Sequence, residues 1–127
     1  MFIRVLRSGL IAAVLGAETF PARQVKVVGP VEYGQPTEQT RYTGTPKYQA
    51  FEFNARPGDR VEVSIKSKTG KLRSFLTDAN YQSLAGGAGH FQATIPAGSQ
   101  PATYYILVTA ESGRAVAYTL ELQRPER

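Results

Sequence analysis

The stretch from Tyr48 to Ile65, YQAFEFNARPGDRVEVSI, constrains the fold more than any other part of the chain. Apolar residues alternate with polar ones from Phe51 to Ala55 and again from Val61 to Ile65. A period of two residues is the pattern of a strand that buries one face. Between the runs lies Arg56-Pro57-Gly58-Asp59, whose proline and glycine suit the centre of a type II turn. We therefore predict a hairpin of two antiparallel strands with their apolar faces in one core.

Short apolar runs separated by turn residues continue along the rest of the chain. The strongest is Thr103 to Thr109, TYYILVT, which is rich in β-branched and aromatic residues. We expect further strands at residues 24–28, 40–43, 74–78, 91–95 and 116–122, and a flexible loop at residues 85–89. No segment has the period of an amphipathic helix. The pattern predicts an all-β fold, a single antiparallel, jelly-roll-like β-sandwich of about seven or eight strands, with a closed barrel as the alternative.

The N-terminus has the pattern of an export signal. Two arginines precede an apolar run from Gly9 to Ala17, and such a run is typical of a signal peptide and too short to span a membrane. Gly16 and Ala22 are the candidate residues before a cleavage site, and the alternative is a first strand or helix of the fold. We predict a signal peptide at residues 1–22, one domain at residues 23–127, and a periplasmic or secreted protein whose mature chain has no transmembrane segment.

Composition narrows the chemistry of this chain of 127 residues. It has no cysteine and a single histidine, which excludes disulfides and thiolate zinc sites. Its carboxylates are scattered, whereas calcium takes about six to eight oxygen ligands. We therefore predict no metal site and no cofactor.

His90, in the run GAGHF, is the one candidate for a catalytic base. Its candidate partner serines are Ser74, Ser83 and Ser99. A solvated loop histidine is the simpler interpretation. Glu52 and Glu62 are expected at outward positions of adjacent strands and are interpreted as solvated surface. We predict a protein that is not an enzyme, with a hydrolase of unknown type as the least favoured alternative.

Four cations follow the central hairpin closely: Lys66, Lys68, Lys71 and Arg73. A basic patch of this kind can bind an acidic glycan, a phosphate or a nucleic acid. No aromatic residue interleaves with these cations to stack on bases, so we predict no nucleic-acid partner. A simple solvated loop is the favoured interpretation, because runs of charge usually serve solubility.

Seven tyrosines are many for a chain of this length. Those expected in the core or at strand ends are Tyr48, Tyr104 and Tyr118. Those expected on loops or outward positions are Tyr42, Tyr81 and Tyr105. Exposed tyrosines are favoured at interfaces, so the second group supplies candidate contact residues, with ordinary surface as the alternative.

The order of several short motifs resembles the bacterial pre-peptidase C-terminal domain. An aromatic-x-Phe strand and a Gly-Asp turn at residues 51–59 precede Val-x-Val-x-Ile at residues 61–65. The later motifs are a Leu-x-Asp-x-Asn turn at 76–80, a glycine-containing loop with Tyr-Tyr-x-x-Val at 98–108, and Gly…Tyr-x-Leu at 113–120. The resemblance implies a secreted, non-catalytic β-sandwich that binds a protein, a glycan or collagen, and in some members calcium.

A narrower resemblance is to the periplasmic inhibitors of g-type lysozyme, which are small exported β-sandwiches without a catalytic domain. They share the aromatic hairpin, the Val-x-Val-Ser-Ile strand and a Pro-Ala-Ser-Gly-x-Tyr loop. In this chain the loop runs from Pro96 to Tyr104, with the Ser-Gly order reversed and residues inserted. The resemblance implies that residues 98–104 plug the glycan cleft of a lysozyme.

The sequence therefore predicts an exported, non-enzymatic β-sandwich that binds an extracellular or periplasmic protein or glycan. Inhibition of a lysozyme is the alternative function. Binding is expected at end loops formed by residues 85–90 and 97–102 with nearby tyrosines. The candidate binding residues are Tyr81, His90, Gly98, Ser99, Gln100, Tyr104 and Tyr105.

Overall fold

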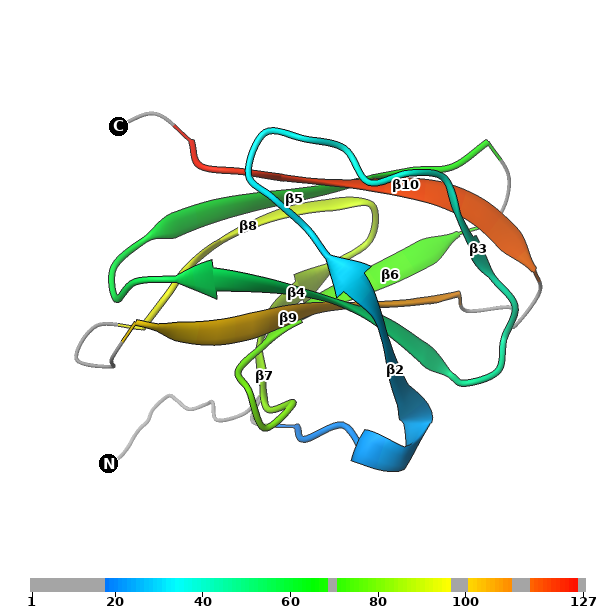
Figure 1. The fold of residues 1–127 in the computed structure, drawn as a ribbon, viewed down its shortest axis with the longest axis horizontal. Coiled ribbons are helices and arrows are strands. Elements are labelled where there is room, and N and C mark those ends of the chain that lie inside the picture. The colour runs from blue at the N-terminus through cyan, green and yellow to red at the C-terminus, as the bar shows by residue number, and fades with distance from the viewer. Residues whose placement is uncertain (1–17, 69–70, 97–100, 111–114, 126–127) are drawn as a thin grey trace, which may run out of the picture.

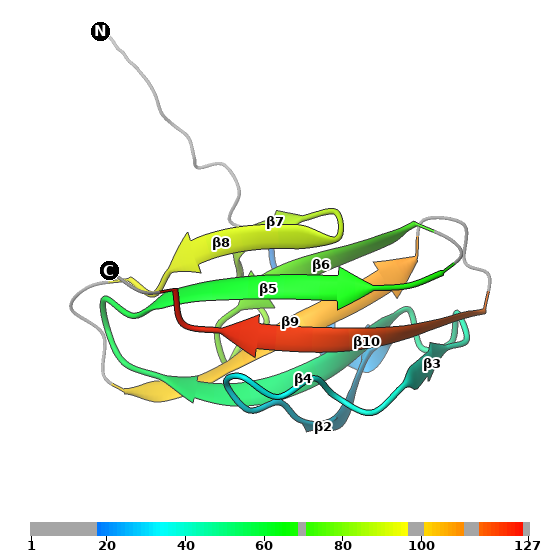
Figure 2. The same ribbon diagram turned by 90° about the horizontal axis from the view of Figure 1, so that it is seen from above.

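The computed structural model describes residues 18–68, 71–96, 101–110 and 115–125. These residues form two β-sheets packed face to face (Figures 1 and 2). The five-stranded sheet contains, in spatial order, β2 (Val25–Pro30), β4 (Tyr48–Ala55), β9 (Ala102–Ala110), β6 (Leu72–Thr77) and β7 (Ser83–Gly87). The four-stranded sheet contains β3 (Thr40–Tyr42), β10 (Val116–Gln123), β5 (Arg60–Lys66) and β8 (His90–Thr94). A single 3-10 turn, η1 (Ala22–Gln24), precedes β2 in this part of the chain.

The predicted all-β sandwich is confirmed. The described strands pair within two separate sheets and not round a closed ring, so the barrel alternative is wrong. Every pair of strands is antiparallel except β2 with β4, which run parallel at the edge of the five-stranded sheet. Figure 2 shows β8, β5, β10 and β3 side by side as one layer.

The core lies between the sheets and consists of the inward residues of each strand. On β4 these are Phe51 and Phe53, and on β5 they are Val61 and Val63, none more than 5% exposed. Later strands add Ile106, Val108, Tyr118, Leu120 and Leu122. Burying one such side chain contributes about 1.5–3 kcal/mol, so the period-two pattern seen in the sequence is the pattern that stabilises the sandwich.

The predicted hairpin is wrong in one respect, because β4 and β5 do not pair. The turn itself forms, with the Asp59 N–H donating to the Arg56 carbonyl at 3.1 Å and Gly58 at φ 84°. It carries the chain from one sheet to the other: β4 pairs with β9, and β5 pairs with β10 and β8. The alternation of apolar and polar residues shows that each strand buries one face. Two strands that face each other across the core, in different sheets, bury these faces as well as two paired neighbours do. Glu52 and Glu62 therefore lie in different sheets.

The predicted loop at residues 85–89 is wrong for residues 85–87, and only residues 88–89 form a bend between β7 and β8. Residues 85–87 belong to β7, which pairs with β6 in the register Ser74↔Gly87 and Phe75↔Gly86. A Cβ on Gly86 would lie 2.8 Å from Cδ1 of Phe75. Glycine here allows one strand to lie close against a neighbouring ring, and is not the sign of a loop.

A second, smaller core covers the outer face of the five-stranded sheet. Its buried members are Phe20, Tyr48, Ala50 and Leu107, with Phe75, Tyr81 and Tyr105 packed against them in part. The segment before η1 supplies the cover, since Phe20 N–H donates to the Tyr81 carbonyl at 3.0 Å. Residues 18–22 of the predicted signal peptide are thus part of the described structure, and residues 1–17 lie outside it.

Candidate binding surfaces

A patch of aromatic and polar side chains lies on the outer face of the five-stranded sheet; we call Glu52, Asn54, Tyr81, Thr103 and Tyr105 the tyrosine patch. Consecutive cross-strand pairs of β4 and β9 place Glu52 opposite Tyr105 and Asn54 opposite Thr103. The ring of Tyr81 lies beside that of Tyr105, with centroids 5.0 Å apart and planes tilted by 51°. Directly opposed side chains in a sheet are about 5 Å apart, so these residues form one continuous surface.

A tight turn after β6 holds Tyr81 in position. The Asp78 carboxylate accepts N–H groups of Asn80 at 2.8 Å and Gln82 at 3.0 Å, and the Tyr81 N–H donates to the Asp78 carbonyl at 3.0 Å. Tyr81 has φ 63°, which costs a residue other than glycine about 1–2 kcal/mol. The chain keeps a large aromatic ring where glycine or asparagine would relieve that cost.

The hydroxyl of Tyr81 is partly removed from water. Burial raises the pKa of Tyr81, and the neighbouring Tyr105 and the negative charge of Glu52 raise it further. Tyr81 therefore stays protonated at neutral pH, as a hydrogen-bond donor beside a carboxylate.

A groove of about 540 Å³ borders the tyrosine patch and shares Glu52, Asn54 and Thr103 with it. Its other lining residues are Pro30, Val31, Glu32, Tyr33, Phe53 and Arg124. The Thr103 hydroxyl donates to Oδ1 of Asn54 at 3.1 Å, which leaves the Asn54 amide N–H groups to face a ligand. Sequence reasoning missed this groove, although Asn54 and Thr103 stand at the outward positions of two predicted strands.

The far wall of the groove is formed by Arg124, whose guanidinium stacks on the ring of Tyr33. The guanidinium of Arg124 lies 4.1 Å from the ring centroid of Tyr33 and 3.7 Å from the Asp59 carboxylate. The Tyr33 hydroxyl donates to the Asn54 carbonyl at 3.1 Å. Burial raises the pKa of Tyr33 despite the opposing effect of Arg124. The wall therefore presents rigid, hydrogen-bonded groups.

The structure separates several of the predicted site residues. Tyr104 is 4% exposed and packs against Phe53 in the core, so its ring does not face a partner. Residues 98–100, which include the predicted Gly98, Ser99 and Gln100, lie outside the described residues. β8 runs from His90 to Thr94, so His90 and Pro96, the last described residue before the second predicted loop, lie at opposite ends of this strand.

His90 lies at the start of β8 and contacts Glu62 on β5. Nε2 of His90 is 2.5 Å from Oε2 of Glu62, and this hydrogen bond lowers the pKa of the Glu62 carboxyl. Ser64 is the cross-strand partner of His90, but no hydrogen bond joins the two side chains. The side chains of His90 and Glu62 are 54% and 29% exposed on an open sheet face. This geometry is a solvent-exposed hydrogen bond in which His90 engages Glu62 and not its cross-strand neighbour Ser64, so it does not form a serine nucleophile with its base.

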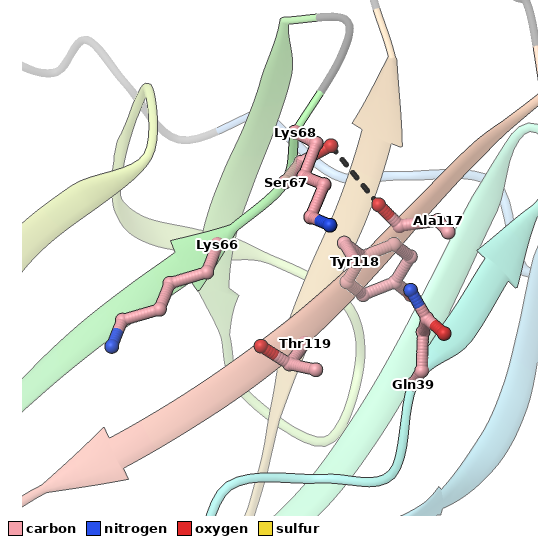
Figure 3. Close-up of a pocket in the computed structure, with 7 residues that line it drawn as sticks. All are labelled: Gln39, Lys66, Ser67, Lys68, Ala117, Tyr118 and Thr119. Atoms are coloured by element: carbon pink, nitrogen blue, oxygen red, sulfur yellow. Dashed lines mark hydrogen bonds between the residues drawn. The ribbon is translucent and has the colours of Figure 1, made fainter.

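The four cations predicted as a basic loop do not form one patch, because Arg73 lies in the other sheet from Lys66 and Lys68. Lys66 and Lys68 line a hollow on the four-stranded sheet, which Figure 3 shows with Gln39, Ser67, Ala117, Tyr118 and Thr119. Arg73 is on β6 in the other sheet, and its guanidinium lies 5.8 Å from the ring centroid of Phe75. The predicted basic loop is therefore divided between two faces of the molecule.

Two other kinds of site are absent from residues 18–68, 71–96, 101–110 and 115–125. No three acidic or histidine side chains there gather as a metal site. No helix in this part of the chain has the length and apolar character needed to cross a membrane.

Comparison with known proteins finds solved structures with a similar fold. No protein-family model matches the sequence, and no curated protein matches it either. Among solved structures, PliG from Aeromonas hydrophila, a periplasmic lysozyme inhibitor of g-type lysozyme, is 17% identical with a TM-score of 0.61, over 80% of this chain and 99% of its own. PliG from Salmonella Typhimurium is 20% identical with a TM-score of 0.53, over 79% and 98%.

A third solved structure belongs to the other group of domains that the sequence resembles. The pre-peptidase C-terminal domain of a collagenase from Bacillus anthracis is 15% identical with a TM-score of 0.52, over 78% of this chain and 94% of its own. The chain has the fold of these domains. Both resemblances predicted from the sequence are therefore confirmed at the level of the fold.

Proposed function

We propose that this protein is an exported, non-catalytic binding module that holds a protein or a glycan on the tyrosine patch and the adjoining groove. The observation that carries the proposal is the pairing of Tyr81 with Tyr105 beside Glu52, Asn54 and Thr103 on two central strands. Tyrosine rings give a large contact area at a small entropic cost, and neighbouring amide, hydroxyl and carboxylate groups give orientation.

The position of the patch supports this assignment. Ala55 pairs with Ala102, so the patch lies a few residues from the end where the 96–102 connection enters β9. The 56–59 turn lies at the same end, since the Gly58 N–H donates to the Ile95 carbonyl at 2.9 Å. A rigid sheet with connections at its end is a common support for binding.

Export is part of the same proposal and rests on the pattern of residues 1–22. The solved neighbours are named as periplasmic inhibitors and as a pre-peptidase C-terminal domain. None of those names describes catalysis by the domain itself, which is consistent with a module that binds and does not react.

The experiment compares capture of the purified protein by peptidoglycan, collagen and a glycan array. Tyr105→Ser should lower capture on the true ligand about tenfold or more, because it removes an interface ring. His90→Ser is the matched control, since it removes an exposed ring from the other sheet. Equal losses in the two variants would contradict placement on the tyrosine patch.

Inhibition of a g-type lysozyme is the second candidate, favoured by the coverage of almost the whole length of two PliG structures. A lysis assay with g-type and other lysozymes tests it, together with Ser99→Ala and Gln100→Ala in the predicted plug. We expect inhibition of the g-type enzyme and its loss in these variants. Inhibition unchanged in both variants would remove residues 98–104 as the contact.

A further inference from the structure

The hollow drawn in Figure 3 lies on the outer face of the four-stranded sheet, away from the tyrosine patch. It forms where β5 leaves β10. Lys66 and Thr119 are the last cross-strand pair, and beyond them the Ser67 hydroxyl donates to the Ala117 carbonyl at 3.0 Å. The side chain of Ala117 is a single methyl group, so the opening of the sheet leaves a trough of about 550 Å³.

The trough is positively charged. Its lining contains Lys66 and Lys68 and no acidic residue. Arg41, the cross-strand partner of Ala117, is a third exposed cation on β3, but it lines a neighbouring hollow together with Glu38. Among the described residues, none of these three side chains has an ion-pair partner. Unpaired cations gathered round one opening attract an anion.

The other polar groups of the trough are suited to hydroxyl groups. The Thr119 hydroxyl and the Gln39 side-chain amide line it, and neither side chain has a hydrogen-bond partner among the described residues. These groups donate and accept, as sugar hydroxyls also do. Tyr118, the one aromatic residue in the lining, is 1% exposed, so the trough offers no ring on which a nucleic-acid base would stack.

The side chains of Lys66 and Lys68 point in different directions, which indicates the length of ligand that the trough can hold. In Figure 3 Lys68 extends toward the ring of Tyr118, whereas Lys66 points away from it. Two ammonium groups that flank an opening suit an elongated ligand with anionic groups along its length better than one small ion.

We propose that this trough is a second binding site, which takes an acidic oligosaccharide through Lys66, Lys68, Gln39 and Thr119. The carboxylates, or other oxyanions, lie against the two lysines, and the sugar hydroxyls contact Gln39 and Thr119. The site is independent of the tyrosine patch, so its failure leaves the proposed function standing.

The test titrates the ¹⁵N-labelled full chain with tetragalacturonate, neutral chitotetraose and inorganic phosphate, followed by amide chemical shifts. We expect tetragalacturonate to move the amides of Lys66, Ser67, Ala117 and Thr119, and to bind more weakly as salt rises from about 0.02 M to about 0.5 M. Equal affinity for chitotetraose would overturn the anionic ligand. Equal affinity for phosphate would overturn the saccharide, and shifts confined to Tyr81 and Tyr105 would overturn the location.

Two variants separate this site from general attraction to a basic protein. Lys66→Gln with Lys68→Gln should weaken tetragalacturonate binding about tenfold or more. Arg23→Gln with Lys26→Gln removes the same charge from η1 and β2, on the five-stranded sheet, and should change it by about twofold at most. Equal losses in the two double variants would overturn the site.

A steric variant tests the trough without changing charge. Ala117→Leu fills the floor of the opening, and at this exposed position the fold should tolerate it. Tetragalacturonate binding should fall about tenfold while the free energy of unfolding stays near that of the wild type. Full binding by a folded Ala117→Leu variant would overturn the proposal.

Discussion

At the scale of single residues, a buried hydrogen-bond network joins the two sheets. The Tyr118 hydroxyl donates to Oε1 of Gln49 at 2.6 Å, and Nε2 of Gln49 donates to the Arg41 carbonyl at 2.9 Å. The Tyr42 hydroxyl donates to the Lys47 carbonyl at 2.9 Å and lies 3.3 Å from Oγ1 of Thr109. Burial raises the pKa of Tyr118 far above its usual range, so this hydroxyl stays a donor.

Replacing Tyr118 by phenylalanine should destabilise the protein by about 1–3 kcal/mol, because Oε1 of Gln49 then loses its donor while buried. Urea unfolding measures the change. Tyr48→Phe is the matched control, since Tyr48 is buried and its hydroxyl has no hydrogen bond within the described residues. A loss as large in Tyr48→Phe would show that the network is not the cause.

The hydrogen bond between His90 and Glu62 predicts a dependence of stability on pH. The Glu62 pKa is lowered in the folded state from its ordinary value of 4.5. Its contribution is therefore full above that value and is lost as pH falls through the lower, folded-state pKa. Glu62→Gln should flatten the acid side of a plot of unfolding free energy against pH.

His90→Ala removes the main cause of the lowered Glu62 pKa, so it should flatten the same limb of the plot. Because the two side chains contact each other, the double variant should lose little more than either single one. Additive losses would mean that the two residues act separately.

At the scale of elements, the segment of residues 18–20 acts as a strap over the five-stranded sheet. The Ser83 N–H donates to the Glu18 carbonyl at 2.7 Å, and Thr19 forms an antiparallel bridge with Gln82. Phe20 is 3% exposed, and its ring centroid is 4.9 Å from those of Tyr48 and Phe75. The strap closes the second core.

Phe20→Ala should lower the free energy of unfolding by about 3–5 kcal/mol, because it leaves a cavity between aromatic rings. A chain that starts at Arg23 lacks the strap, so it should be less stable than a chain that starts at Glu18 by a similar amount. Denaturant unfolding of the three chains measures this. If a signal peptide is removed, we expect the cut after Gly16 and not after Ala22; equal stability of the two truncated chains would contradict this.

At the scale of the whole molecule, the two proposed sites lie on opposite outer faces of the sandwich. Tyr105 faces outward from the five-stranded sheet and Lys66 from the four-stranded sheet. Two rigid layers separate them, and distant sites without shared partners act additively. Tyr105→Ser should therefore leave tetragalacturonate binding within about twofold of the wild type, as measured by calorimetry. A larger change would show that the faces are coupled.

Most strands were predictable because alternation is a local property of the chain. β5, β8, β9 and β10 all carry the period-two pattern that burial of one face requires. β7 was missed because Gly86 and Gly87 remove the side chains that would have shown it. The strap was missed because Phe20 follows an apolar run of the kind that export signals share.

By itself the sequence determined the fold class, the inward face of each main strand and the turn at residues 56–59. Only the tertiary structure decided which strands are neighbours, and so which outward residues meet. The groove with Glu52, Asn54 and Thr103, the hydrogen bond of Glu62 with His90, and the division of Lys66 from Arg73 all depend on it. The physical reason is that a strand can bury its apolar face in either sheet of the sandwich, so alternation does not reveal which sheet the strand joins. The pairing of the strands depends instead on which connections cross from one sheet to the other.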